Sequence, residues 1–435
     1  MKSPTFALLS GLALAVSVNA ATHAVLPGKS IQEKINLAVA GDIVAIFGGT
    51  YNEDLTIDKA IRLVEVSGQQ VIITGNIVFS GVADCPPFEG FTVGSSGRGI
   101  TVTNTTGLVF RNLDTRNGSG ITTTGTTALS IAESQLSSIN HSAANLNTTS
   151  VTVAGDFVTQ SAARKTVAFR TTVTGDCVWR SKRNWFGYSE ARSFNFHDQN
   201  EAKLVLVGNK IDRQGGEANG IHCNVSNSSI VITNNRIVRV GYAYNGDSEN
   251  GIDLRGGGNQ AMIANNYCQL QYGGENPYHW AGYGCRGDGI YVRDFNQATI
   301  INNIIVGARY GISAPFGVLA QNNLYWASPW NGSTLEANGV TAEGTLYTDP
   351  LFVENEAPKL QAGSPCINAG TTDPRYNDRD GTRNDIGPSG GPWIDPDGWT
   401  TENPVVISFD LSPDQVLEGV DTEVILSEGQ AVSAP

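Results

Sequence analysis

Short apolar stretches separated by polar corners recur through the middle of the chain. Four segments begin with Gly-Ile and continue through a polar corner into a second apolar stretch; their glycines are Gly220, Gly251, Gly289 and Gly311. Each then reaches an asparagine, and the series is Asn235, Asn266, Asn303 and Asn323, with Asn209 one repeat earlier. Because equivalent residues recur at the distance of one repeat, each segment reads as one coil of a solenoid.

The pattern predicts an all-β fold, a right-handed single-stranded parallel β-helix in which each repeat forms one coil. The asparagines should stack at one corner and form a ladder, each side-chain amide bonding the next coil. An antiparallel β-sandwich is the alternative, but its hairpins need alternation around two-residue turns. Shorter apolar stretches between Ile61 and Val173 fit further strands of the solenoid.

One segment carries a helical period. Ser30–Ala40 has a serine cap followed by apolar Ile31, Ile35, Leu37 and Val39, which predicts a helix that caps the N-terminal end of the solenoid.

The ends of the chain differ from the repeats. Residues 1–20 read as a signal peptide, because a lysine precedes an apolar run and a Val-Asn-Ala cleavage site. We expect export to the periplasm or the extracellular space after its removal. The β-helix should occupy residues 21–392, followed by a linker at 393–404 and a strand-rich cap at 405–435. About 30 residues are too few to bury an independent core.

Composition and charge narrow the function. Fifty glycines and only 16% charged residues agree with short strands joined by tight turns. A net charge of −13 argues against nucleic acid or an anionic membrane as a partner. No stretch after the signal peptide approaches the roughly 20 apolar residues that a membrane span needs. We expect a monomer.

The six cysteines are far apart and lack the spacing of a zinc site. A disulfide between Cys268 and Cys285 is the preferred pairing in an oxidising compartment, and free cysteines stacked inside the coil are the alternative.

Segments at both ends of the repeats resemble the pectin-lyase-like right-handed parallel β-helix family. The stretch SIQEKINLAVAGDIVAIFGGTYNEDLTIDKAIRLVEV, from Ser30, is similar to the cap helix and first coils of that family. TDPLFV from Thr348, AGSPCINAG from Ala362 and DRDGTRNDIGPSGGP from Asp378 look like the closing segment of its secreted bacterial members. The resemblance covers Ala24–Pro392 and implies a groove that binds or acts on a polysaccharide. The resembling segments do not identify a catalytic subfamily.

Candidate catalytic residues follow from strand alternation. The isoleucines after the repeated glycines should point inward, so the residues after them point outward. One outward column then holds His197, His222, Asp253, Tyr291 and Ser313. The next outward column holds Gln199, Asn224, Arg255 and Arg293. Parallel coils stack about 4.8 Å apart, so neighbours within a column can contact one another.

Three long insertions, at 176–190, 241–249 and 271–286, should enter the same region. Exposed aromatic rings offer platforms for sugars, and guanidinium groups pair with carboxylates, so these insertions indicate an acidic polysaccharide as partner. A mere cover for the sheet is the alternative. The candidate substrate-binding residues are Trp179, Arg180, Lys182, Arg183, Trp185, Tyr188, Tyr244, His279 and Trp280.

The leading hypothesis is a polysaccharide lyase acting on a uronate-containing glycan by β-elimination. Arg255 and Arg293 would neutralise the substrate carboxylate, His222 or His197 would take the C5 proton, and Tyr291 would protonate the leaving oxygen. Asp253 would orient His222. We expect loss of either arginine to leave stability nearly unchanged, because exposed arginines contribute little to folding.

Three rival functions stay open. A glycoside hydrolase would need two carboxylates, from Asp253 with Asp288 or from Asp247 with Glu249. An epimerase shares the lyase's chemistry, and a non-catalytic protein could bind glycan in the same groove.

No metal ligands or cofactors are predicted firmly. Calcium is a candidate, with Asp253 as a ligand in the groove or acidic residues of the closing segment elsewhere, although turn formation is the alternative. Those acidic residues are Asp373, Asp378, Asp380 and Asp385.

Overall fold

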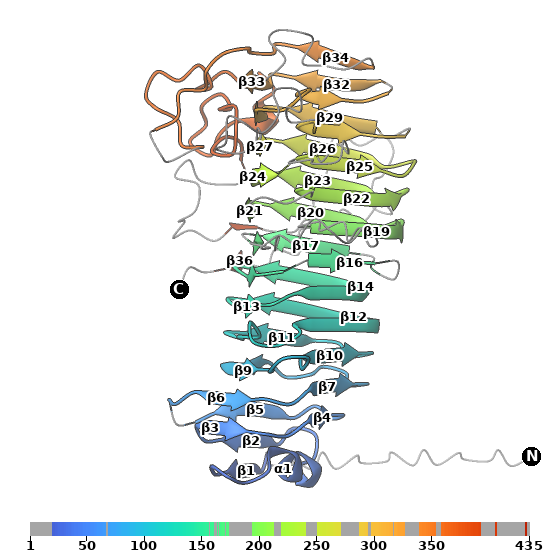
Figure 1. The fold of residues 1–435 in the computed structure, drawn as a ribbon, viewed down its shortest axis with the longest axis vertical. Helices are drawn as coiled ribbons and strands as arrows, with labels where there is room; N and C mark the ends of the chain where they lie inside the picture. Colours follow the sequence, from blue (N-terminus) through green and yellow to red (C-terminus); the bar gives the residue numbers. More distant parts are fainter. Residues whose placement is uncertain are drawn as a thin grey trace, which may run out of the picture.

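The described chain winds into a right-handed parallel β-helix, as the repeat predicts (Figure 1). Among the strands that the structure describes, every pair is parallel except β35 (Val405–Val406) with β36 (Ala431–Val432). The computed structural model describes residues 20–66, 68–155, 157–160, 163, 165–169, 171–173, 194–212, 219–240, 250–270, 287–294, 297–315, 317–326, 339–353, 358–392, 405–406 and 431–432.

The coils form three faces. The first face holds β4 (Leu55–Ile57), β7 (Ile77–Ser80), β10 (Ile100–Thr103), β12 (Ile121–Ala132), β14 (Ile139–Thr149), β16 (Phe157–Thr159), β19 (Phe194–Asn200), β22 (Ile221–Ser226), β25 (Ile252–Arg255), β28 (Ile290–Val292) and β31 (Ile312–Ser313). Strands β12 and β14 are long enough to continue around the corner into the second face.

The second face continues with β8 (Phe88–Glu89), β11 (Leu108–Arg111), β17 (Lys165–Phe169), β20 (Lys203–Val207), β23 (Ser229–Thr233), β26 (Gln260–Ala264), β29 (Gln297–Ile301), β32 (Val318–Gln321) and β34 (Val340–Glu343). Near the N-terminal end, β1 (Thr22–Val25), β2 (Ile43–Ile46) and β5 (Arg62–Glu65) form a separate three-stranded sheet.

The third face begins with β3 (Gly49–Tyr51), β6 (Val71–Ile73) and β9 (Phe91–Val93). It continues with β13 (Gln135–Leu136), β15 (Thr152–Val153), β18 (Thr172–Val173), β21 (Lys210–Asp212), β24 (Arg236–Val240), β27 (Tyr267–Leu270), β30 (Ile304–Val306) and β33 (Leu324–Trp326).

Alternation along each strand builds the core inside the coils. In β22, Ile221, Cys223 and Val225 point inward and are buried, and the positions of Ile221 and Cys223 hold Ile252 and Leu254 on the next coil. Because the inward side chains of the three faces pack against one another and against the coils above and below, the core is one continuous column.

The predicted asparagine ladder is confirmed. The side-chain amide of Asn209 donates to Asn235 Oδ1 at 2.8 Å, and three further amide-to-amide bonds of 2.9, 3.0 and 2.9 Å continue through Asn266 and Asn303 to Asn323. The residue before each ladder asparagine has a positive φ, which asparagine and glycine tolerate better than other residues. These residues are Gly208, Asn234, Asn265, Asn302 and Asn322.

The repeated glycines lie where the third face turns into the first. A β-carbon at Gly251 would lie 2.5 Å from the carbonyl oxygen of Gly289 and 3.2 Å from Sγ of Cys268. At Gly220 and Gly289 it would collide with isoleucines of the third face. Only glycine fits this corner, which explains the Gly-Ile signal.

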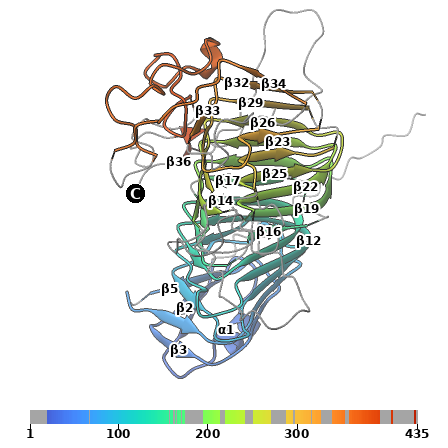
Figure 2. The same cartoon turned by 45° about the horizontal axis from the view of Figure 1, so that its top comes forward.

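The closing segment, 358–392, lies along the outer side of the third face (Figures 1 and 2). Ile386 and Cys366 join Tyr267, Ile304 and other residues of that face in a second apolar cluster. The asparagines with positive φ hold its backbone: Asn234 Nδ2 donates to Gly390 O at 2.7 Å, and Asn265 Nδ2 donates to Asp385 O at 2.8 Å.

Helix α1 (Ile31–Leu37) is shorter than predicted. Ser30 caps it, accepting a hydrogen bond from the Glu33 N–H at 3.0 Å, and Ile31 and Ile35 are buried. Leu37, the last residue of the helix, is 60% exposed, and Val39, beyond its end, is 56% exposed. The helix ends early because the N–H of Val39 donates to the Asp42 carboxylate at 3.0 Å instead.

The predicted disulfide is also wrong. Among the described residues, Cys85, Cys223, Cys268 and Cys366 are buried and unbonded; the first three lie inside the coil, as the alternative expects, and Cys366 lies in the closing segment. Cys177 and Cys285 lie outside the described residues. Cys268 points into the core beneath Gly251, where its side chain is fully buried.

The signal peptide and the linker lie outside the described residues, save Ala20, as does most of the C-terminal cap. Within the part of the chain that the structure describes, no helix has the length and apolar character needed to cross a membrane.

Candidate functional site

The outer column on the first face has the predicted register over four coils. His222 pairs with Asp253, Asp253 with Tyr291, and Tyr291 with Ser313. The residue before them in the column is Asn195, which pairs with His222, so the placement of His197 there is wrong. Phe194 and Phe196 both point inward, and this shifts His197 by two positions along β19.

His197 lies instead in the second column, where it pairs with Asn224, and Asn224 pairs with Arg255. The N–H of Arg293 donates to Leu254 O at 2.7 Å, which continues the register onto the next coil. Gln199 does not belong there.

A bulge between His197 and Gln199, with Asp198 at φ 56°, turns Gln199 inward. Gln199 is buried, and its amide donates to the Thr159 hydroxyl at 2.5 Å.

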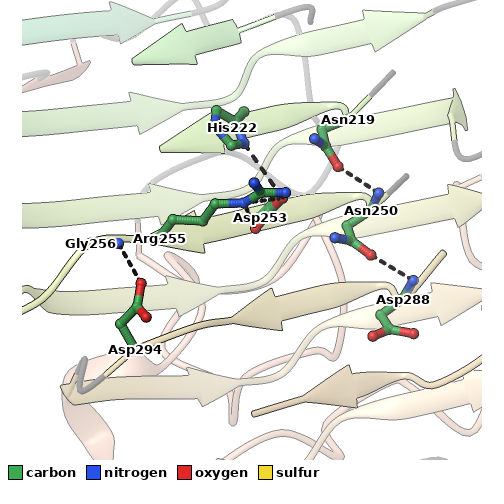
Figure 3. Close-up of polar contacts among 8 residues, drawn as sticks. All are labelled: Asn219, His222, Asn250, Asp253, Arg255, Gly256, Asp288 and Asp294. Atoms are coloured by element: carbon green, nitrogen blue, oxygen red, sulfur yellow. Dashed lines mark hydrogen bonds and ion pairs between the residues drawn. The ribbon is translucent and has the colours of Figure 1, made fainter. Parts of the chain in front are cut away.

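Asp253 is the centre of the site (Figure 3). Arg255 Nε lies 3.2 and 3.0 Å from the two carboxylate oxygens, and Nη2 lies 2.8 Å from Oδ2. On the other side, His222 Nδ1 lies 3.4 Å from Asp253 Oδ2. Exposed fractions of the side chains are 1% for His222, 0% for Asp253 and 31% for Arg255. Three polar side chains on the outer side of the coil are therefore largely withdrawn from water.

The charge of Asp253 depends on these neighbours. Burial alone would raise its pKa, but the hydrogen bonds and charges of His222 and Arg255 outweigh burial and hold the pKa below its ordinary value. Asp253 is thus an ionised carboxylate at neutral pH, able to fix the orientation of the imidazole.

Tyr291 and Arg293 stand on the next coil, and both are half-buried. The Arg293 guanidinium carbon lies 4.4 Å from the centroid of the Tyr291 ring, a cation–π contact. His197 stands apart from this group, with Nδ1 3.0 Å from the carboxylate of Asp198. The structure thus joins His222, Asp253 and Arg255 directly and places Tyr291 and Arg293 beside them.

Sequence reasoning missed a second ladder beside the column. The N–H of Asn250 donates to Asn219 Oδ1 at 2.6 Å, and the N–H of Asp288 donates to Asn250 Oδ1 at 2.9 Å (Figure 3). The signal was available, because an Asn or Asp precedes three of the repeated glycines. We name these three residues the corner ladder.

The carboxylate pairs suggested for a hydrolase fit less well. Arg255 binds Asp253, and Arg309 binds Asp288 with Nη2 3.0 Å from Oδ1. Burial raises the pKa of Asp288 in spite of Arg309. Asp247 and Glu249 lie outside the described residues.

All nine substrate-binding candidates also lie outside the described residues. They are Trp179, Arg180, Lys182, Arg183, Trp185, Tyr188, Tyr244, His279 and Trp280.

The acidic residues of the closing segment serve its turns. Asp378 accepts hydrogen bonds from the N–H groups of Gly391 and Asp385, and Asp380 accepts from Thr382. Asp373 caps the short 3-10 helix Pro374–Tyr376. Across the described ranges, no group of three or more His, Cys, Asp or Glu side chains could hold a metal ion. No chemical step below uses a metal ion.

No family model and no curated protein matches this sequence. Among solved structures, pectate lyase Pel9A is 15% identical with a TM-score of 0.30, and the match covers 86% of this chain and 97% of that one. ORF18 of Geobacillus virus E2 is 14% identical with a TM-score of 0.25, covering 72% and 57%. A mutant of the PL6 family alginate lyase AlyGC is 12% identical with a TM-score of 0.24, covering 90% and 60%. These likenesses assign no activity to this chain.

The arrangement can move a proton. A carboxylate that accepts a hydrogen bond from one imidazole nitrogen fixes the ring and makes the other nitrogen a stronger base. Tyr291 on the adjacent coil supplies a phenolic hydroxyl, which can donate a proton. The nearby guanidinium groups favour an anionic substrate group.

Proposed function

We propose that this chain is a secreted, monomeric polysaccharide lyase that cleaves a uronate-containing glycan by β-elimination. The observation that carries the proposal is the buried Asp253 carboxylate, which contacts both His222 and Arg255 on the outer side of the first face. A buried, ionised carboxylate beside an imidazole is costly to maintain and is the arrangement that general-base chemistry needs.

In the proposed reaction, His222 Nε2 takes the proton from C5 of the uronate. The electron pair of the broken C–H bond forms the C4–C5 double bond, and the C4–O bond breaks. Tyr291 gives its phenolic proton to the departing oxygen. The products are an unsaturated uronate and a new glycan end, and the protons later return through water.

The two arginines take different parts in this proposal. Two nitrogens of Arg255 donate hydrogen bonds to Asp253, so the main role of Arg255 is to keep that carboxylate ionised and in place. Arg293, one coil further on, meets the substrate carboxylate, whose negative charge increases as the C5 proton leaves.

The test is a panel of acidic polysaccharides incubated with the purified protein, with the ultraviolet absorbance of an unsaturated uronate as the readout. We expect absorbance with at least one polymer, and a loss on the order of a thousandfold in kcat for His222→Ala, the general base. His197→Ala is the matched control, because His197 is a histidine on the same strand face that does not contact Asp253.

Other outcomes contradict the proposal in distinct ways. New reducing ends without absorbance indicate a hydrolase, and inversion at C5 without chain cleavage indicates an epimerase. Binding without any product indicates a non-catalytic glycan-binding protein.

A further inference from the structure

The corner ladder is buried, as is the asparagine ladder at the opposite corner. Its members Asn219, Asn250 and Asp288 are 4%, 0% and 1% exposed. Backbone hydrogen bonds between Gly220 N–H and Asn250 O, and between Gly251 N–H and Asp288 O, tie the same coils at 3.1 and 3.0 Å. Each pair of coils is thus joined here by both backbone and side chain.

The ladder ends in an ion pair. The Asp288 carboxylate accepts hydrogen bonds from Arg309, with Nε 3.1 Å from Oδ1, from the Ser313 hydroxyl and from the N–H of Tyr310. Arg309 is itself fixed, because its N–H donates to Gly287 O at 2.9 Å and its guanidinium lies over the Tyr310 ring at 4.8 Å. All five members of the opposite ladder are asparagines, and none carries charge.

Every member of the corner ladder stands three residues before a residue of the outer column. Asn219 precedes His222, Asn250 precedes Asp253, and Asp288 precedes Tyr291. The glycine between them leaves no space for a β-carbon, so the short link is tightly packed. A displacement of a ladder residue should therefore also displace the residue of the outer column three positions later.

The ladder members also follow stretches of sequence that connect strands of the third face to strands of the first. Residues 213–218, 241–249 and 271–286 connect to the strands just before its three members. The first residues of a strand after a long connection open more easily than its middle, and buried side-chain bonds oppose that opening.

We propose that the corner ladder, closed by Arg309, is a positioning device that sets the relative heights of His222, Asp253 and Tyr291. Its members are positioning residues and touch no substrate. The proposal rests on the proposed function for its turnover readout only; a second readout is independent of activity.

The test compares Asn250→Ala with Asn266→Ala. Both asparagines are fully buried ladder members on the same coil, one at each corner. We expect similar falls in Tm for the two variants. Asn250→Ala alone should lower kcat, on the order of tenfold to a hundredfold, with KM nearly unchanged, because a small misplacement of catalytic groups acts on the chemical step.

The activity-independent readout is the imidazole nitrogen resonances of His222 in ¹⁵N-labelled protein, which report its contact with Asp253. We expect them to move in Asn250→Ala and to stay in Asn266→Ala. Arg309→Gln should move the His222 resonances in the same direction as Asn250→Ala does, and Arg375→Gln is its surface control. If Asn250→Ala does not fold, Arg309→Gln tests the positioning role instead.

Resonances and kcat that respond alike in the two asparagine variants would overturn the positioning role. Resonances that move only in Asn250→Ala, in a protein that cleaves no glycan, would keep the ladder's role and reject the proposed function.

Discussion

The carboxylate of Asp253 gives Arg255 a structural role that its outward position alone does not indicate. An exposed arginine contributes little to folding, but Arg255 is only one-third exposed and binds a carboxylate that is fully buried. Among the described residues, removing it leaves that carboxylate with His222 as its remaining side-chain partner. The expectation that loss of Arg255 leaves stability unchanged therefore needs revision.

Arg255→Met should lower the free energy of unfolding by about 2 kcal/mol, less than for a fully buried pair because Arg255 is partly in water. Urea denaturation at pH 7 measures it. Arg375→Met is the matched control, since Arg375 pairs with an aspartate two residues earlier but is 80% exposed. Equal effects of the two substitutions would contradict a special role for Asp253.

His141 is a titratable residue inside the coil, away from the proposed site. It is fully buried, its Nδ1 lies 2.6 Å from the Thr123 hydroxyl, and burial lowers its pKa to about 4. Because the folded pKa lies below the unfolded value, the folded state binds fewer protons between pH 6.5 and 4. Stability from this group is complete above pH 6.5 and is lost as the pH falls.

His141→Gln should remove that pH dependence. The loss in the native protein between pH 7 and 4 should be about 3 kcal/mol larger than in the variant, from 2.5 pKa units at 1.36 kcal/mol each. Unfolding free energies at pH 7, 5.5 and 4 measure the difference. Parallel curves for the two proteins would show that His141 does not titrate in this range.

At the scale of the strand and corner, the repeated glycines leave no space for a side chain. Gly251→Ala forces a β-carbon against the backbone oxygen of Gly289, so the coils must separate locally. We expect a loss of about 2–3 kcal/mol. Gly257→Ala is the control, because a β-carbon there meets nothing within 4 Å. A Tm of Gly251→Ala equal to that of Gly257→Ala would mean that the corner can relax.

The elements also show how far the sequence reaches. The Gly-Ile steps and the asparagine ladder were predictable, because each recurs once per coil and each has a single physical cause: lack of space for a β-carbon at the glycines and amide-to-amide bonding at the asparagines. The register of β19 was not, since FNFHD fits two alignments and only the inward packing of Phe194 and Phe196 distinguishes them. The corner ladder could have been predicted, because its Asn or Asp residues directly precede the repeated glycines. The contacts of Asn234 and Asn265 with the closing segment could not, because they join residues more than 100 positions apart and no local pattern encodes them.

For the whole molecule, the net negative charge of the protein opposes the approach of the proposed acidic substrate. A chain of net charge −13 repels a polyanionic glycan at long range, although arginines lie at the candidate site. The screening length falls from about 30 Å at 0.01 M salt to about 8 Å at 0.15 M. Raising the salt over this range should therefore increase kcat/KM on the cleaved polymer. A steady decrease would show that local positive charge governs encounter with the substrate.

The closing segment changes how the solenoid as a whole can come apart. A stack of coils with only nearest-neighbour contacts unravels one coil at a time from an end. Here the amide of Asn234 is bonded to Pro388, 154 residues away, and Asn322 is bonded to Ala369. The closing segment therefore contacts several coils at once along the third face. We expect these coils to unfold together, in one cooperative step, rather than one at a time. The chain can complete these contacts only after residue 390 has been synthesised, so they form after the coils that they join.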